Sequence, residues 1–127
     1  KSGFRFFNDN SGGKAFFKLN AGNGTADTWV DGGDPAKVDP SVTTGWFHLA
    51  FTISKSNAIF YLNGQEIKSS AFTGIDWTGC DILSIMSGAP RFTGWGHNSS
   101  LAMMDELYLF NKALSSDEVI LMMQDGM

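Results

Sequence analysis

Two adjacent carboxylates, Asp105 and Glu106, stand in an otherwise apolar stretch near the C-terminal end of the chain. Paired acids of this kind could hydrolyse a glycosidic bond, which requires both groups in one cleft, or could bind a metal ion. In a β-strand, consecutive residues point to opposite faces, and none of the neighbouring positions that would complete a pair on one face is acidic. Two histidines in unlike contexts are also too few to suggest a Ser-His-Asp arrangement. We therefore expect no enzymatic activity.

A structural or metal-binding role for Asp105 follows from the same strand alternation. Asp105 shares its predicted face with Leu107 and Leu109, which a regular strand would bury. A buried carboxylate must be hydrogen-bonded, ion-paired or bound to a metal. Asp105 is thus expected either to accept hydrogen bonds from a nearby loop, locking the strand, or to be a metal ligand. Glu106, on the opposite face, is expected to form a cross-strand ion pair or to face solvent.

Aromatic residues in Gly-rich or polar segments indicate a possible site for a sugar. A tryptophan ring stacks on the apolar face of a pyranose, while Arg and Asn side chains reach its hydroxyl groups. The stretch "PRFTGWGHNSS" gathers several such residues. The candidate carbohydrate-binding residues are Trp29, Trp77, Arg91, Trp95, His97 and Asn98. The alternative interpretation is that these rings only cover the ends of the fold.

The elements that must position these residues follow a period of two. Turn formers, including Asn63-Gly64, separate short runs of alternating apolar residues. In the run 46–54, Leu49, Phe51 and Ile53 share one face. The predicted strands are residues 4–7, 14–20, 28–30, 46–54, 58–62, 66–72, 81–88 and 102–110. Such a series of short strands predicts an antiparallel β-sandwich or jelly roll.

One short helix is predicted at the C-terminal end. The sequence "SSDE" is a capping-box pattern, with Ser115 as the cap and Glu118 three residues later. The helix is expected over residues 119–124, with Gly126 as a stop, and to close one edge of the sandwich.

Three of these stretches resemble the laminin-G-like, concanavalin A-like jelly-roll domains. They are "GWFHLAFTISKSNAIFYLNGQEI", "LSIMSG" and "AMMDELYLFNKALSSDEVILM", and the likeness extends from Trp46 to about Met123. The resemblance implies an antiparallel β-sandwich with one C-terminal helix. It also implies a Ca²⁺ ion held near positions such as Asp105 by Asp side chains and loop carbonyls. It leaves the function open, because this fold hosts lectins, adhesive modules and glycosidases.

Length, charge and cysteine content exclude several other classes. The 127 residues form one domain, whereas members of the family usually have ~150–200 residues. We therefore expect an N-terminally incomplete fragment of a longer precursor, whose opening strands lie upstream of Lys1. A net charge of −4 argues against nucleic acids and anionic membranes, and no apolar run reaches the ~20 residues that a membrane-spanning helix needs. The single cysteine, Cys80, rules out an intrachain disulfide or a Cys-based zinc site.

The sequence thus predicts a non-catalytic, lectin-like module of a secreted or cell-surface bacterial protein. Its expected partners are a polysaccharide or glycoprotein glycan and the other domains of a longer chain. The expected location is the cell surface, the extracellular space or the periplasm. Two alternatives stay open: a protein-adhesion or spacer module that binds no sugar, and a degenerate glycosidase domain.

Overall fold

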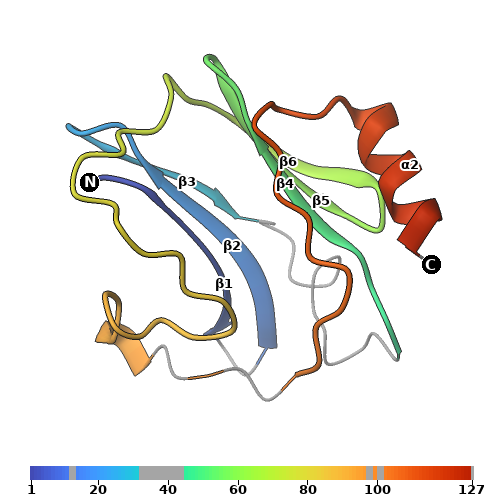
Figure 1. The fold of residues 1–127 in the computed structure, drawn as a ribbon, viewed down its shortest axis with the longest axis horizontal. Helices are drawn as coiled ribbons and strands as arrows, with labels where there is room; N and C mark the ends of the chain where they lie inside the picture. The colour runs from blue at the N-terminus through green and yellow to red at the C-terminus, as the bar shows by residue number, and fades with distance from the viewer. Residues whose placement is uncertain (12–13, 32–44, 97–98, 100–101, 127) are drawn as a thin grey trace.

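The computed structural model describes residues 1–11, 14–31, 45–96, 99 and 102–126. The elements are β1 (Phe4–Ser11), β2 (Lys14–Gly22), β3 (Asp27–Asp31), β4 (Leu49–Ile53), β5 (Asn57–Leu62), β6 (Gln65–Ala71), the 3₁₀ turn η1 (Gly94–Gly96) and α2 (Ser116–Gly126). Strands β1-β2-β3 form one antiparallel sheet, sheet A, and β4-β5-β6 form a second, sheet B (Figure 1). The predicted antiparallel sandwich with one C-terminal helix is confirmed. No helix among the described residues has the length and apolar character needed to cross a membrane.

Aromatic side chains between the two sheets make the core. The ring of Phe6 in sheet A lies 4.9 Å from the Phe51 ring and 5.4 Å from the Phe60 ring of sheet B, measured between centroids. Phe60 is completely buried. Leu49, Phe51 and Ile53 pack against this cluster, so the face predicted for that strand is confirmed. The buried members of the core are Leu19, Ala21, Val30, Ala58, Phe60 and Phe72.

The hairpin between β5 and β6 turns at the predicted Asn63-Gly64 pair. Both residues have positive φ, 49° and 75°, as a two-residue type I′ turn requires. Helix α2 packs directly over this turn: a Cβ added to Gly64 would lie 3.2 Å from Cγ1 of Ile120. Gly64 is thus needed both for its backbone conformation and for the close approach of the helix.

We expect Gly64→Ala to destabilise the chain more than Gly79→Ala does. Gly79 has almost the same φ, 73°, but no atom lies within 4 Å of its added Cβ. The stability of the control should fall only by what the left-handed conformation costs an L-residue, about 1–2 kcal/mol. Gly64→Ala should lose about 1–3 kcal/mol more from overpacking against Ile120. Urea unfolding of both variants measures the difference, and equal losses would mean that the helix does not press on the turn.

Helix α2 begins at the predicted capping box. The Glu118 backbone N donates to Ser115 Oγ at 3.3 Å, and the Ser115 backbone N donates to Glu118 Oε2 at 2.8 Å. The helix has 11 residues, so the predicted length was too short. As predicted for a helix at a sandwich edge, α2 contacts β6, an edge strand of sheet B. Tyr61, which strand alternation directs away from the core, is buried with its hydroxyl 3.4 Å from Ser116 Oγ, so the helix covers the outer side of sheet B.

Two predicted strands do not form. Residues 81–88 and 102–110 are irregular, and all their large apolar side chains except Met86 are about half exposed or more. A run with strand character forms a strand only where another strand offers its backbone groups, and no described segment forms a ladder with residues 81–88 or 103–110. The expected burial of Asp105 beside Leu107 and Leu109 was therefore wrong: all three residues are exposed.

A pH dependence of stability is expected from His48, which lies just before β4. Its Nδ1 atom is buried without a hydrogen-bond partner among the described residues, and burial lowers the pKa of His48 from its ordinary value of 6.5. Between the lowered pKa and 6.5 the unfolded chain binds more protons than the folded chain. Stability should therefore fall as the pH drops below 6.5 and should rise again towards neutrality.

Urea unfolding at pH 7 and at mildly acidic pH tests this dependence. His48→Leu should reduce the loss of stability on acidification, whereas His97→Gln, which removes the other histidine, should leave it in place. If the acid-induced loss of stability disappeared in His97→Gln and persisted in His48→Leu, the assignment to His48 would be wrong.

Candidate functional site

The outer face of sheet A carries a set of polar and aromatic side chains. The strand register pairs Arg5 with Asn20 and Asn20 with Trp29, and it pairs Phe7 with Lys18 in a neighbouring row. Alternate residues of a strand share a face, and the residues between these positions belong to the core. All five side chains therefore lie on the face of sheet A that points away from sheet B.

A loop ending in η1 covers part of this face and brings a second tryptophan onto it. The rings of Trp95 and Trp29 lie 6.2 Å apart, centroid to centroid, with planes 27° from parallel. Phe92 meets the Trp95 ring edge-on at 5.4 Å. The Arg5 guanidinium carbon lies 4.4 Å from the centre of the Phe92 ring and 5.8 Å from that of Trp95, both within the range of cation–π attraction.

Arg5 is itself held by the sheet. Its Nε donates to Asn20 Oδ1 at 3.1 Å, and its Nη2 donates to the same oxygen. The Asn20 amide nitrogen donates in turn to the Thr28 carbonyl at 3.4 Å. Asn20 is only 2% exposed although it lies on the outer face, because the loop and Arg5 cover it. The loop is thus anchored to the strands through one guanidinium group.

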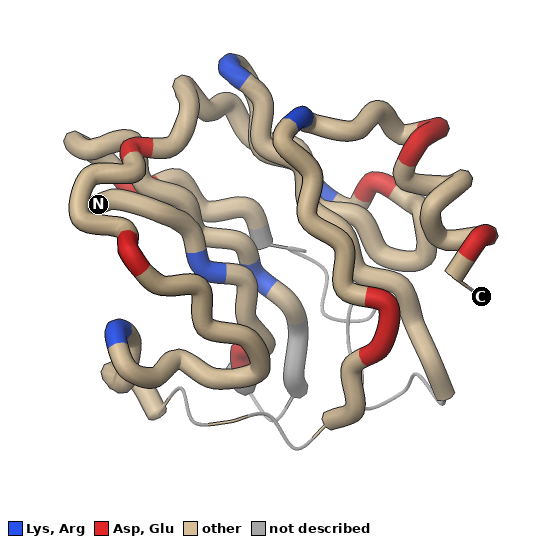
Figure 2. Tube along the Cα trace, in the orientation of Figure 1, with Lys and Arg blue, Asp and Glu red and all other residues tan. Residues whose placement is uncertain are grey.

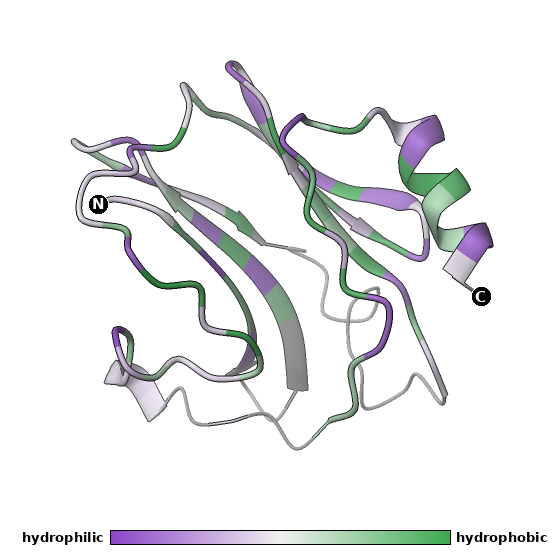
Figure 3. Cartoon of the chain, viewed as in Figure 1, coloured by the Kyte–Doolittle hydropathy of each residue, from purple (hydrophilic) through white to green (hydrophobic). Residues whose placement is uncertain are grey.

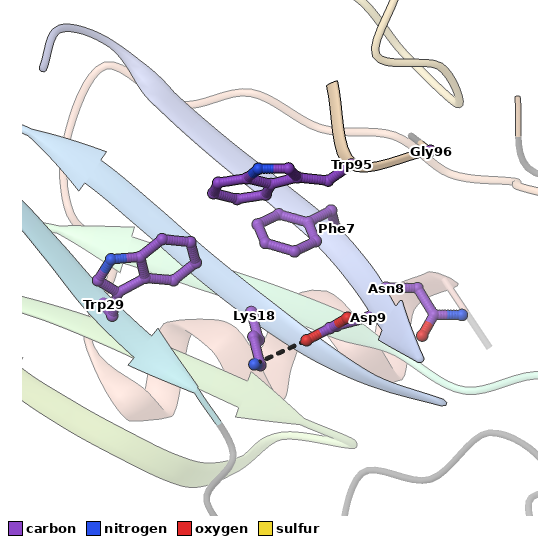
Figure 4. Close-up of a pocket in the computed structure, with 7 residues that line it drawn as sticks. All are labelled: Phe7, Asn8, Asp9, Lys18, Trp29, Trp95 and Gly96. Atoms are coloured by element: carbon purple, nitrogen blue, oxygen red, sulfur yellow. Dashed lines mark ion pairs between the residues drawn. The ribbon is translucent and has the colours of Figure 1, made fainter. Parts of the chain in front are cut away.

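A groove of about 440 Å³ opens beside the two tryptophans (Figure 4). Its walls are aromatic, since Phe7 also meets the Trp29 ring nearly perpendicularly at 6.0 Å. Its polar part is an ion pair, with Lys18 Nζ 2.7 Å from Asp9 Oδ2. The lining residues are Phe7, Asn8, Asp9, Lys18, Trp29, Trp95 and Gly96.

This combination suits a ligand with flat apolar faces and polar edges. The indole faces offer stacking surfaces, and the ion pair offers a donor and an acceptor side by side. Among the described residues, the second carboxylate oxygen of Asp9 has no hydrogen-bond partner, so it is available to a ligand. Ligand grooves generally combine apolar surfaces with converging polar groups, and this groove offers both.

Of the six predicted carbohydrate-binding residues, the structure brings Trp29 and Trp95 together. Trp77 lies elsewhere, with its ring edge-on to Phe4 at 6.0 Å, and it does not line the groove. Arg91 is exposed and forms an ion pair with Asp81 at 2.5 Å, also outside the groove.

The two other candidates, His97 and Asn98, lie outside the described residues.

Sequence reasoning missed the contribution of the first hairpin. The predicted strands 4–7 and 14–20 left Asp9 in the turn between them, whereas β1 continues through Ser11 and β2 begins at Lys14. The signal that could have found these residues is the alternation of Arg5, Phe7 and Asp9 along one face of an extended β1.

The Asp105 side chain is more exposed to solvent than that of a calcium ligand should be. Its Oδ1 accepts a hydrogen bond from the Glu106 backbone N at 2.9 Å, and the residue is exposed. Ca²⁺ usually takes about 6–8 oxygen ligands. In the described part of the chain no three His, Cys, Asp or Glu residues are grouped so as to hold a metal ion. These residues do not form the expected donor set, and calcium binding stays a prediction.

Comparison with known proteins shows one family and one similar solved structure. A laminin G family model, described as the concanavalin A-like lectin/glucanases superfamily, matches residues 1–120. A crystal structure of an S-layer domain-containing protein from Clostridium thermocellum, residues 221–444, is similar with a TM-score of 0.54 and 18% sequence identity. The similarity covers 97% of this chain and 64% of that chain, and at this identity it shows the fold alone. No curated protein matches the chain.

Proposed function

The chain belongs to the laminin G branch of the concanavalin A-like lectin/glucanase superfamily, and from this premise we propose that it is a non-catalytic carbohydrate-binding module. The observation that supports this function best is the pair of nearly parallel indoles, Trp29 and Trp95, beside the Asp9–Lys18 ion pair. A pyranose ring offers axial C–H groups to an aromatic face and hydroxyl groups around its rim. The groove supplies a partner for each.

The ligand class that fits the groove is a neutral oligosaccharide. The charges of Asp9 and Lys18 cancel, and the Arg5 guanidinium is engaged by Asn20, Phe92 and Trp95. The chain as a whole carries a net charge of −4, which disfavours uronate- or sulfate-bearing glycans. Asp9 would accept hydroxyl hydrogen bonds, and Lys18 would donate to hydroxyl oxygens.

The small number of acidic side chains in the groove favours binding of a glycan without hydrolysis. Glycosidases generally use two carboxyl groups about 5–9.5 Å apart across the scissile bond. Among the described lining residues Asp9 is the single acid, and it is paired with Lys18. This arrangement supports recognition of a glycan and offers no second carboxylate for catalysis.

We place this module in a secreted or cell-surface protein, alongside other domains. The support is the likeness in fold to an S-layer domain-containing protein, in which the matched part makes up 64% of the crystallised chain. Glycan binding at a surface would then serve attachment, with the chemistry left to other domains.

Isothermal titration calorimetry with a panel of oligosaccharides tests the proposal. We expect saturable binding of neutral oligosaccharides, weaker or no binding of uronic acid oligosaccharides, and a change in tryptophan fluorescence on binding. A chelator arm tests calcium separately: binding that is lost with EDTA and restored with Ca²⁺ would assign the ion a role. Absence of binding to every glycan would contradict the proposal and favour the adhesion or spacer alternative.

We expect Arg5→Lys to weaken glycan binding although Arg5 does not line the groove. Lysine cannot donate twice to Asn20 while lying flat against Phe92 and Trp95, so the loop should detach more often. A cation–π contact contributes about 0.5–2 kcal/mol, which corresponds to roughly 2–30-fold in affinity. Titration measures this loss, and limited proteolysis should show faster cleavage near Trp95. Unchanged proteolysis together with weaker binding would mean that Arg5 acts directly on the ligand.

A further inference from the structure

Asp9 and Lys18 form the polar side of the groove, and both project from the outer face of sheet A. The register of β1 and β2 pairs Lys18 with Phe7, two residues before Asp9, so Asp9 and Lys18 are diagonal neighbours on one face. Figure 3 shows the alternation of hydrophilic and hydrophobic residues along β2 that keeps Lys18 on this face, while the residues on either side of it pack in the core. Strand register, rather than a loop, therefore fixes the pair.

The ion pair is partly removed from solvent. The Lys18 side chain is 19% exposed and the Asp9 side chain is 35% exposed. These two are the charged residues among the described residues that line the groove. Figure 2 shows the acidic and basic positions scattered along the chain, and exposed charges farther away than about 8–10 Å are largely screened at physiological salt. The charge that a ligand meets in the groove thus depends mainly on this pair.

The two carboxylate oxygens of Asp9 have different surroundings. Oδ2 is paired with Lys18 Nζ, whereas the other oxygen has no hydrogen-bond partner among the described residues and is turned away from Lys18 in Figure 4. A sugar hydroxyl group can donate a hydrogen bond to that oxygen. A uronate or sulfate group has no proton to donate at neutral pH and brings a like charge beside it. The same oxygen therefore favours an uncharged sugar and repels an acidic one.

We propose that Asp9 is the specificity-determining residue of the groove, because its carboxylate offsets the charge of Lys18 and excludes glycans that carry carboxylate or sulfate groups. The inference rests on the proposed function and assigns the preference for neutral oligosaccharides to one side chain. Specificity often comes from a repulsive contact with the wrong ligand as well as from an attractive contact with the right one. Removing the Asp9 charge makes the groove more positive by one unit, which attracts acidic glycans.

Titration calorimetry of Asp9→Asn with two classes of oligosaccharide tests this assignment. The substitution keeps the size of the side chain and removes its charge. Binding of uronic acid oligosaccharides should strengthen about 10-fold or more, and this gain should shrink as salt is added. Binding of neutral oligosaccharides should weaken about 3–10-fold, because an amide oxygen accepts a weaker hydrogen bond than a carboxylate oxygen does.

Glu66→Gln is the matched control, since it makes the same change of net charge at an exposed position on β6, outside the groove. It should leave binding of both classes unchanged. An equal gain for uronic acid oligosaccharides in the Asp9→Asn and Glu66→Gln variants would overturn the proposal, because net charge would then set the preference. If the wild-type chain binds neutral oligosaccharides and Asp9→Asn gains no affinity for acidic ones, this inference fails while the proposed function stands. Absence of binding to every glycan by the wild-type chain and the variant would contradict both.

Lys18→Gln provides the reverse test and does not depend on the folding of Asp9→Asn. It removes the Lys18 charge beside Asp9, so the groove becomes more negative by one unit. Binding of glucosamine oligosaccharides, measured at a mildly acidic pH that protonates their amino groups, should strengthen about 10-fold, and binding of uronic acid oligosaccharides should not. The melting temperature of each variant is measured alongside, to show that the chain is folded. No gain for glucosamine oligosaccharides in folded Lys18→Gln would overturn the proposal.

Discussion

Replacing Trp29 by alanine is expected to weaken oligosaccharide binding about 10–100-fold, a loss of roughly 1.4–2.8 kcal/mol typical of an aromatic hot-spot residue. Trp29 lies on β3, and its ring contacts both Phe7 and Trp95 in the groove. Its removal takes away one stacking face and the ring that stacks on Trp95. Titration calorimetry with the oligosaccharide that the wild-type chain binds measures the loss.

Trp77→Ala is the matched control for this substitution. Trp77 is also an exposed indole, but its ring packs on Phe4 outside the groove. The control should bind the oligosaccharide with wild-type affinity, and Trp29→Phe should retain part of the affinity because it keeps an aromatic face. Equal losses in the Trp29→Ala and Trp77→Ala variants would contradict the assignment of the site to this groove.

The largest effect on stability is expected from Phe60→Ala. Phe60 is 0% exposed, and its ring contacts Phe6 across the two sheets at 5.4 Å. Truncating a buried phenylalanine removes its transfer free energy and leaves a cavity, at a cost of about 3–5 kcal/mol. Domains of this size are generally stable by about 5–15 kcal/mol, so this loss could unfold much of the population. Urea unfolding measures the change in the free energy of unfolding.

Phe110→Ala is the corresponding control, because Phe110 is 48% exposed in the irregular stretch 102–110. Its cost should stay within about 0.5 kcal/mol, as for most surface substitutions. A loss of less than about 1 kcal/mol for Phe60→Ala would mean that the two sheets do not share the core described here.

Much of the fold could be predicted because its signals are local. The alternation of Leu49, Phe51 and Ile53 identified the face of β4 that packs against the core, and Asn63-Gly64 identified the turn between β5 and β6. Ser115 and Glu118 identified the start of α2. In each case residues close in sequence carry the physical cause: side-chain period, permitted φ, or a satisfied backbone N–H group.

The failures share one physical cause, which is that strand formation and site geometry depend on distant partners. Residues 103–110 have the composition of a strand, yet no described strand forms a ladder with them. The expected burial of Asp105 failed for that reason, and with it the support for a calcium ligand from strand alternation. Local pattern specifies what a segment can do, whereas pairing requires a second segment at the right place.

The residue types and spacings by themselves determined the sandwich class, the capped helix and the candidate status of Trp29 and Trp95. Only the tertiary structure decided that these two rings meet while Trp77 lies elsewhere, because their contact depends on a loop held to sheet A by Arg5 and Asn20. It also decided that Asp9 and Lys18 join them. Strand register fixes which side chains become neighbours across a sheet, and register is a property of paired strands rather than of any single one.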